Sequence, residues 1–262
     1  MGGSRDLVWD VALPAAAVAL LLGAWQLIAV ALDVPKWLLP SPVSILKAFW
    51  AWKATLGWHF VVTLYETVAG FALAVAVGVP LAVGMIYSRI LHSALYPILA
   101  AVQSVPRSAI APLLLVWFGA GELPKVIIVF LISFFPIVIN TLTGMRQVEP
   151  DLLDLTASLC ATKGQTVWQV RFPNAIPYAF SAFKMSITLS VVGAVIGEFV
   201  GADRGLGYMI LIAASQLKTD VAFVCIGLLA FMGMGLFACV ELVERLFLPW
   251  YTPEEREAHA QA

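Results

Sequence analysis

Charged residues are scarce in this 262-residue sequence, and their scarcity decides its class. Lys, Arg, Asp and Glu make up 12% of the chain, whereas soluble domains carry about 25%. Hydrophobic residues reach 61%, and the mean hydropathy is +0.94. A net charge of −1 gives no basis for nucleic-acid binding. These values exclude an ordinary soluble domain and predict a polytopic membrane protein.

Sequence signatures of catalysis, cofactor binding and metal binding are also missing. The three cysteines, Cys160, Cys225 and Cys239, have neither CxxC nor metal-ligand spacing. The sequence contains no HExxH, no recognisable Ser/His/Asp arrangement and no Gly-x-x-x-x-Gly-Lys-Ser/Thr phosphate loop. We therefore expect no catalytic residues, no cofactor and no metal in this chain.

What the sequence does have is six apolar runs, each long enough for a helix that crosses a bilayer, which takes about 20 residues. The runs cover residues 12–32, 59–87, 90–119, 125–145, 175–201 and 221–248. The first is too long for the apolar region of a signal peptide, so we expect a retained helix. The sequence therefore predicts one all-α transmembrane domain over residues 1–262, with about six spans and both termini on the same side. The Lys and Arg residues divide seven against six between the two sides, which does not set the orientation.

The third run is unlike the others because prolines interrupt it. Pro97, Pro106 and Pro112 lie within it, together with Gln103 and Arg107. Proline removes a backbone donor and bends or breaks a helix. Irregular backbone at membrane depth is tolerated only inside protein or along a wet cavity. We predict a broken helix that faces the interior of the bundle or of an assembly, with a simple proline kink as the alternative.

Two segments between the runs are also predicted to be helical. Residues 43–54 follow Pro40-Ser41-Pro42, a natural helix start, and their aromatic residues suit a helix in the membrane interface. Residues 205–216 are too short to cross the bilayer and predict a short helix between the last two spans.

A polar stretch, residues 146–173, separates the fourth and fifth runs. Residues 152–160 have leucines at roughly helical spacing, which predicts a helix with one apolar face. Thr162-Lys163-Gly164-Gln165 matches a capping box that starts a second helix. We predict a helix, a sharp exposed turn at residues 161–163, a second helix through residue 170, and a return to the membrane marked by Pro173 and Pro177.

The same stretch resembles a loop found in the membrane subunits of bacterial ABC importers. That loop is written Glu-Ala-Ala, three residues, Gly, nine residues, Ile, one residue, Leu-Pro. At the matching positions this chain has Asp154-Leu155-Thr156, Cys160, Val170 and Phe172-Pro173. Cys160 departs from the family's glycine, and cysteine adopts left-handed backbone less readily than glycine. Either the turn has a different shape, or the position needs only a small side chain.

Further segments resemble the nitrate/sulfonate/taurine permease group, over residues 34 to 250. They are residues 39–42, 112–121, 135–141, 201–208 and 248–250. The resemblance implies a type I ABC importer fold and a permease subunit that forms the solute pathway. It implies cytosolic ABC ATPase subunits, a second permease copy in a homodimer, and a periplasmic or lipid-anchored solute-binding protein. ATP hydrolysis would belong to the partner, because this chain lacks a phosphate loop.

The resemblance also implies a bacterial inner-membrane protein with residues 146–173 and both termini in the cytoplasm. The ATPase would then contact the turn and the helix before it. The expected coupling residues are Asp154, Thr156, Leu159, Cys160, Ala161, Thr162, Lys163, Gly164 and Gln165. The alternative is an ordinary amphipathic loop lying on the membrane.

Polar residues inside the spans are candidates for the solute pathway. An ionisable residue at the bilayer centre costs about 2.5–3.5 kcal/mol, so each one needs a partner or a function. The candidates are Glu66, Gln103, Arg107, Asn140, Lys184 and Glu198. An ion pair such as Glu66 with Arg107 would lower the cost, and structural pairing and solute contact both remain open. His59 and His92 lie near the ends of runs and are expected at the membrane interface or in solvent.

The sequence narrows the solute only to a class. Family permeases often have a basic residue where Glu66 stands, so a carboxylate there argues against a small inorganic anion. Residues 63–71 and 201–208 look closer to a subgroup that handles pyrimidines or other aromatic vitamin precursors. We expect a small organic molecule or anion, of the sulfonate, taurine or nitrate type or a pyrimidine or vitamin precursor. An ATP-independent secondary transporter or channel is the alternative, because Arg107 lies in a broken span.

Overall fold

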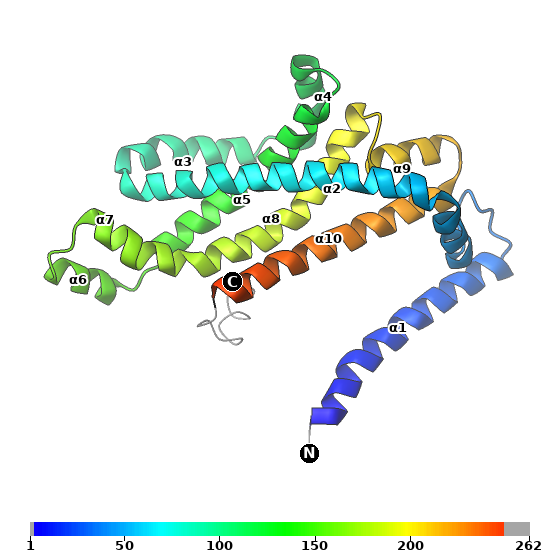
Figure 1. Ribbon diagram of the computed structural model, residues 1–262, viewed down its shortest axis with the longest axis horizontal. Helices are drawn as coiled ribbons and strands as arrows, with labels where there is room; N and C mark the ends of the chain where they lie inside the picture. Colours follow the sequence, from blue (N-terminus) through cyan, green and yellow to red (C-terminus); the bar gives the residue numbers. More distant parts are fainter. Residues whose placement is uncertain (1–2, 249–262) are drawn as a thin grey trace.

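The computed structural model of the protein describes residues 3–248, all of them in helices and short connections (Figure 1). Side chains of residues 3–11 and of Arg107 lie outside the described part. The helices are α1 (Gly3–Ala31), α2 (Pro42–Tyr87), α3 (Arg89–Gln103), α4 (Arg107–Phe118), α5 (Glu122–Arg146), α6 (Pro150–Ser158), α7 (Lys163–Thr166), the π-helical turn η1 (Val167–Arg171), α8 (Phe172–Gly201), α9 (Leu206–Ser215) and α10 (Thr219–Phe247).

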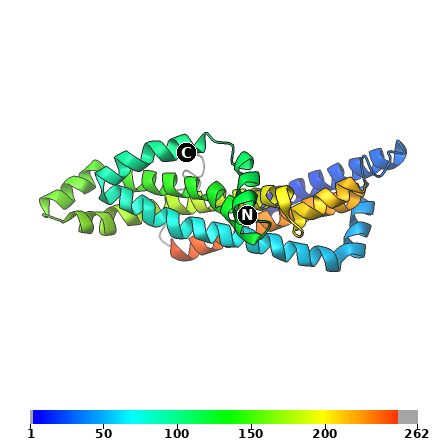
Figure 2. The ribbon, with the colours of Figure 1, turned by 90° about the horizontal axis from the view of Figure 1, so that it is seen from above.

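Five of these helical segments are long and apolar enough to cross a membrane, and the bent pair α3–α4 makes a sixth span if counted as one. This confirms the predicted all-α fold with about six transmembrane helices. The helices α2, α5, α8 and α10 form the bundle, seen from two directions in Figures 1 and 2. The segment α6–α7 lies at one end of the long axis, and α9 lies toward the other (Figure 1).

The two central helices, α5 and α8, approach closely because glycines line their contact. A Cβ on Gly193 would lie 3.1 Å from the Cα of Val129, and one on Gly197 would lie 3.2 Å from the Cα of Lys125. Small residues of this kind allow close packing of helices in membranes, where lipid offers no hydrophobic drive to associate. A hydrogen bond between the Oγ atoms of Ser133 and Ser190, 2.6 Å apart, adds to the contact.

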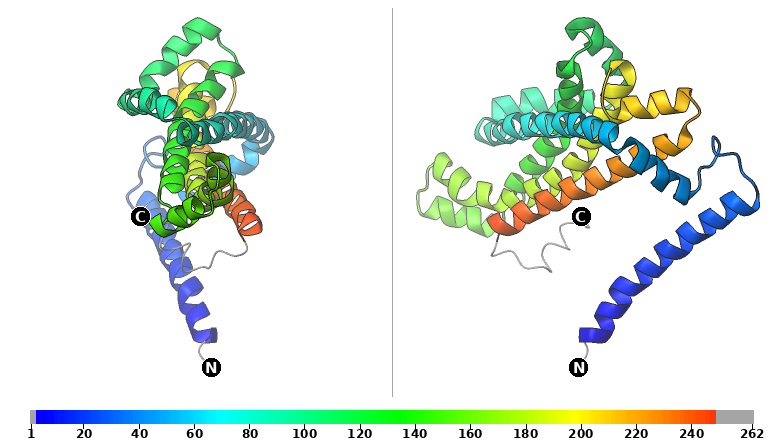
Figure 3. Two further views of the ribbon diagram at one scale, coloured as in Figure 1. Left: turned by 90° about the vertical axis from the view of Figure 1, so that its left-hand side faces the viewer. Right: turned by 45° about the vertical axis from the view of Figure 1, so that its right-hand side comes forward.

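The first helix, α1, runs away from the bundle and exposes most of its apolar side chains from residue 12 onward (Figure 3). Helix α2 starts where the sequence predicts, since the Ser41 hydroxyl accepts a hydrogen bond from Ser44 N and Pro42 opens the helix. Residues 43–54 are helical as predicted, and their placement in the membrane interface stays a prediction. They form the first part of α2, which continues to Tyr87. At about 1.5 Å per residue its path is about 69 Å, well beyond the thickness of a bilayer core.

The third apolar run is broken, as predicted. Helices α3 and α4 meet at 104°, and the break falls at residues 104–106, just before Arg107. Pro97 and Pro112 lie inside the two helices without ending them. Within α3 only Leu99 is buried, so α3 does not face the interior of the single-chain bundle, and the alternative that it faces an assembly stays a prediction. Helix α4, in contrast, packs Ala111 and Leu114 against the bundle.

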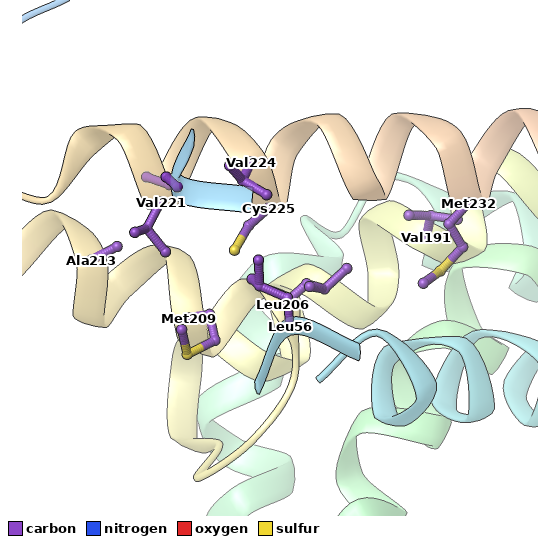
Figure 4. Packing of buried hydrophobic residues seen from close by; sticks show 11 residues of the cluster. Leu56, Val191, Leu206, Met209, Ala213, Val221, Val224, Cys225 and Met232 are labelled. Carbon is purple, nitrogen blue, oxygen red and sulfur yellow. The ribbon is translucent and has the colours of Figure 1, made fainter. Parts of the chain in front are cut away.

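The predicted short helix before the last span is present as α9. Its apolar residues Leu206, Met209 and Ala213 pack against Val221 and Cys225 of α10 (Figure 4). Cys225 is buried in this cluster, where it packs as a small hydrophobic residue. The cluster fixes α9 across the ends of the long helices, which brings its N-terminus to the polar groups described below.

Candidate functional site

The polar segment between α5 and α8 contains the predicted capping box. The backbone N–H of Thr162 donates to Oε1 of Gln165 at 2.8 Å, and the N–H of Gln165 donates back to Oγ1 of Thr162 at 3.3 Å. This reciprocal pair satisfies two donors that the start of α7 leaves without helical partners. The turn is therefore held by its own four residues, and this prediction is confirmed.

Cys160 occupies the left-handed position of the turn, with φ of 51°. The N–H of Ala161 donates to the carbonyl of Thr156 at 3.0 Å, and the N–H of Cys160 donates to that of Ala157 at 3.0 Å. These two bonds form a Schellman motif, in which glycine is the preferred residue at the position that Cys160 takes. The backbone shape that suits the family's glycine is thus kept, and only the residue differs.

The apolar side of α6 points largely away from the protein. Leu152, Leu155 and Leu159 are exposed to 43%, 55% and 72% respectively, while Leu153 is half-buried. Trp168, in the π-helical turn η1, is exposed as well. The predicted apolar face therefore exists, but within this chain most of it lacks a packing partner. Exposed apolar groups gathered on one short helix are typical of a contact surface.

The predicted second helix does not end near residue 170 but continues through Pro173. From Lys163 to Gly201 the chain is helical throughout, with η1 leading directly into α8. Proline lacks the backbone N–H that an interior helix position needs, and the π-helical turn just before Pro173 changes the hydrogen-bonding pattern at this point. Motion of α7 can pass into α8 along one helical path.

Polar side chains also tie the start of α8 to the end of α5. The Arg171 guanidinium donates to the carbonyl of Met145 at 3.0 Å. The amide of Asn174 donates to the carbonyls of Gly144 and Gln147 at 2.9 and 3.1 Å. These bonds satisfy carbonyls at the end of α5 that have no partner within the helix.

A second polar cluster lies within the bundle, and its centre is an ion pair. Nζ of Lys125 on α5 lies 2.7 Å from Oε1 of Glu66 on α2, and both side chains are buried. Glu66 thus has a partner other than the suggested Arg107, whose side chain lies outside the described residues. Glu198 on α8 is an electrostatic neighbour of the pair. The other carboxylate oxygen of Glu66, Oε2, accepts no hydrogen bond from the described residues.

The carboxylate of Glu198 anchors the N-terminus of α9. It accepts hydrogen bonds from the hydroxyl of Thr63, at 2.6 Å, and from the N–H of Gly207. The Thr63 oxygen in turn accepts from the N–H of Leu206 at 2.8 Å. A carboxylate at a helix N-terminus satisfies free N–H groups and complements the helix dipole. Glu198 therefore has a structural role as the cap of α9.

His59 belongs to the same network, which corrects the expectation of a solvent-exposed side chain. Its side chain is buried, and Nδ1 accepts a hydrogen bond from the N–H of Gly205 at 2.9 Å. Its ring lies 6.0 Å from that of Tyr208. The sequence placed His59 at the end of a span, but α2 extends 17 residues before it, so His59 lies well inside the helix.

The remaining pathway candidates are scattered. Lys184 on α8 forms an ion pair with Glu244 on α10 at 2.9 Å. The amide of Asn140 donates to the carbonyl of Pro136 within α5, and Gln103 is exposed at the end of α3. Of the six candidates, the structure brings together Glu66 and Glu198. Sequence reasoning missed Lys125 and Glu244, although each is a charge within or at the edge of a predicted span.

Comparison with known proteins identifies the family. Residues 74–252 match the family model described as "Binding-protein-dependent transport system inner membrane component". The riboflavin transport system permease protein RibX of Chloroflexus aurantiacus is 36% identical, over 88% of this chain and 87% of the relative. The formylaminopyrimidine transport permease protein ThiX of Halalkalibacterium halodurans is 32% identical, over 88% and 92%. The taurine transport system permease protein TauC of Escherichia coli is 28% identical, over 95% of both.

A solved structure agrees with the fold. A chain of the MetNI methionine ABC transporter in an inward facing conformation superposes with a TM-score of 0.60, covering 79% of this chain and 97% of its own length, at 18% identity. The permeases of this family work with an ATPase and a solute-binding protein. The chain belongs to the family of binding-protein-dependent transport inner membrane components, and it is a multi-pass permease subunit of an ABC importer.

Proposed function

We propose that the segment formed by α6, the turn at residues 159–162 and α7 is the surface by which this permease is driven by its ATPase. The observation that carries the proposal is the exposed apolar side of α6, with Leu152, Leu155 and Leu159 projecting from a rigid support. The Schellman motif at Cys160 and the capping box at Thr162 fix the turn from both sides. A rigid, apolar projection on a membrane subunit suits docking to a soluble partner.

The alternative, an amphipathic loop lying on the membrane, is less well supported. Asp151 and Asp154 are exposed on the same helix, and a membrane-surface helix is usually rich in Lys and Arg on its polar face. The direct helical path from α7 into α8 also gives a mechanical link to the bundle, which a loop resting on lipid would not need.

Substitution of the exposed leucines tests the proposal. Leu155→Ser and Leu159→Ser are expected to weaken co-purification of the ATPase with the permease about tenfold each, because each removes apolar contact area at the interface. Leu217→Ser is the matched control, since Leu217 is equally exposed in the connection between α9 and α10. Full retention of the ATPase by both α6 variants would rule out this surface as the docking site.

For the solute, we propose a nitrogen heterocycle of the pyrimidine or flavin class. The relatives named for riboflavin and formylaminopyrimidine are 36% and 32% identical. Two relatives named for aliphatic sulfonates are 31% and 30% identical, and those named for taurine and nitrate are 28% and 27%. The buried lysines of the bundle also argue against a small inorganic anion, because Lys125 and Lys184 already pair with Glu66 and Glu244. An anion would have to compete with a carboxylate for either of them.

Uptake by the complete transporter in proteoliposomes tests the solute class. Riboflavin or a formylaminopyrimidine is expected to stimulate ATP hydrolysis and accumulate, whereas taurine and nitrate are expected to do neither. The same assay without ATP addresses the alternative of a secondary transporter, which would accumulate solute without the ATPase. Stimulation by taurine or nitrate alone would overturn the proposed solute class.

We further propose a homodimer of this chain, with α6–α7 and both termini in the cytoplasm. An all-around apolar exposure, as on α1, suits contact with lipid or with a second copy. Cysteine accessibility in intact and opened cells tests the orientation: Cys160 is expected to react with a membrane-impermeant maleimide only after the cells are opened.

A further inference from the structure

A cavity of about 730 Å³ separates the coupling segment, which is α6, the turn at residues 159–162 and α7, from the ends of the membrane helices. Its wall comes from the end of α2, the start of α3, the end of α5, and α6, α7 and η1. The cavity is therefore bounded on one side by the bundle and on the other by the segment that we propose to contact the ATPase. These elements lie together at one end of the molecule (Figure 1).

The charge of the cavity wall has one sign. Four basic side chains line it: Arg89, Arg146, Lys163 and Arg171. No carboxylate is among the described residues of the wall, whose other polar side chains are His92, Tyr87 and three Ser or Thr residues. The wall thus carries four positive charges and several hydrogen-bond donors, with nothing negative facing them.

These cations are also free to bind a ligand. Among residues 3–248, none of the four forms an ion pair. Only Arg171 donates a hydrogen bond to a backbone carbonyl, that of Met145. His92, another residue of the wall, has a buried Nε2 with no partner among the described residues. Lys125 and Lys184, by contrast, each have a carboxylate partner. Arg and Lys side chains that converge on one cavity without carboxylate partners can donate charge-assisted hydrogen bonds to an anion.

We propose that this cavity binds a phosphate-bearing anion, supplied either by the headgroup of an anionic membrane lipid or by a soluble phosphate. Arg and Lys bind phosphate oxygens through charge-assisted hydrogen bonds. Basic pockets between membrane helices on the cytoplasmic side are typical sites for anionic headgroups. The cytoplasmic location rests on the proposed function, but the anion binding itself does not require the ATPase.

The bound anion has a mechanical consequence. Arg89 and Arg146 belong to the helix ends of the bundle, whereas Lys163 belongs to α7 and Arg171 to η1, which continues directly from α7. Without an anion these two groups repel each other across the cavity. A phosphate between them joins the coupling segment to α3 and α5, so the anion sets how firmly motion of α7 is transmitted.

Titration of the purified full-length permease tests the binding. Isothermal titration calorimetry would use short-chain phosphatidylglycerol, short-chain phosphatidylcholine and inorganic phosphate as separate probes. The double variant Arg89→Gln/Arg146→Gln is expected to bind the anion about 25-fold more weakly, because each basic side chain facing an anionic group contributes about a fivefold factor. Lys36→Gln/Lys47→Gln removes the same charge from exposed positions outside the cavity and is expected to bind as the wild type does.

Each outcome has a defined meaning. Binding of phosphatidylglycerol without phosphate assigns the site to a lipid, and binding of phosphate alone assigns it to a soluble anion; both support the proposal. Failure of both anions to bind the wild type overturns it, and so does equal binding by the double variant. Two further measurements separate loss of binding from loss of folding: Arg89→Lys/Arg146→Lys keeps the charges and should retain binding, and wild-type binding should weaken as NaCl is raised. Salt-independent binding would also overturn the proposal.

Discussion

The hydroxyl of Tyr87 lies directly against Gly164, so that a Cβ on Gly164 would stand 2.7 Å from the phenolic oxygen. Tyr87 is the last residue of α2, the helix that carries Glu66, and Gly164 lies in the first turn of α7. The contact joins the end of a long bundle helix to the segment proposed to meet the ATPase. The absence of a side chain at residue 164 is what permits it.

Gly164→Ala is expected to leave the permease folded while reducing transport. Alanine favours a helix over glycine by about 0.5–1 kcal/mol, so α7 itself gains stability. The new methyl group displaces the exposed Tyr87 ring, and with it the link between α2 and α7. Solute-stimulated ATP hydrolysis should fall several-fold in proteoliposomes. Adding Tyr87→Phe removes the clashing oxygen and should restore much of the activity; normal coupling in Gly164→Ala alone would show that this contact is not part of the transmission.

Cys160→Gly is expected to stabilise the permease without loss of coupling. A residue with a side chain pays about 1 kcal/mol in left-handed backbone that glycine avoids, and Cys160 has φ of 51°. Thermal unfolding in detergent should therefore show a higher midpoint. Cys239→Gly is the control, because Cys239 is exposed within α10, where glycine costs about 0.5–1 kcal/mol relative to alanine. A lower midpoint for Cys160→Gly would contradict the assigned turn geometry.

Lys125→Met is expected to destabilise the bundle by about 3–5 kcal/mol, because it leaves the buried carboxylate of Glu66 without its partner. The double variant Lys125→Met/Glu66→Gln removes both charges and should recover a large part of the loss. Denaturant unfolding of the purified protein measures both. Arg245→Gln breaks the exposed Arg245–Glu241 pair instead and should cost no more than about 1 kcal/mol. Equal losses of unfolding free energy in Lys125→Met and Arg245→Gln would mean that the buried pair contributes no more to stability than the exposed pair.

Gly205→Ala is expected to detach α9 and abolish transport. Residue 205 has φ of 113°, which side-chain-bearing residues rarely adopt, and a Cβ there would overlap the carboxylate of Glu198. The variant should lose its folded yield or show much faster proteolysis near residues 202–216. Gly235→Ala in α10 is the control, since its Cβ would meet nothing within 4 Å and alanine suits a helix. Wild-type stability in Gly205→Ala would exclude the described anchoring of α9.

Local chemistry made the coupling segment predictable. The capping box depends on four successive residues, 162 to 165, and was therefore visible in the sequence. The start of α2 at Pro42 and the break before Arg107 were predictable for the same reason. The continuation of the helix through Pro173 was not predictable, because the π-helical turn that precedes it has no clear sequence signature, whereas proline has one.

Partners far apart in the sequence were not predictable. Lys125 and Glu66 are 59 residues apart, and Thr63 and Glu198 are 135 apart, so only the packing of α2, α5 and α8 brings them together. Lys125 and His59 each stand at the first position of a predicted apolar run, whereas α5 and α2 begin before them and both side chains are buried. In each case the polar residue could be recognised in the sequence, but its burial depends on helices elsewhere in the chain.

Photo-crosslinking from Cys160 tests the central claim most directly. Cys160 is exposed at the turn after α6, and a benzophenone maleimide attached to it in the assembled transporter reports what lies within reach. The account predicts a crosslink to the ATPase subunit that is absent in Cys160→Ser and is not formed from the exposed Cys239 of α10. A crosslink from Cys160 to the solute-binding protein or to lipid, with none to the ATPase, would contradict it.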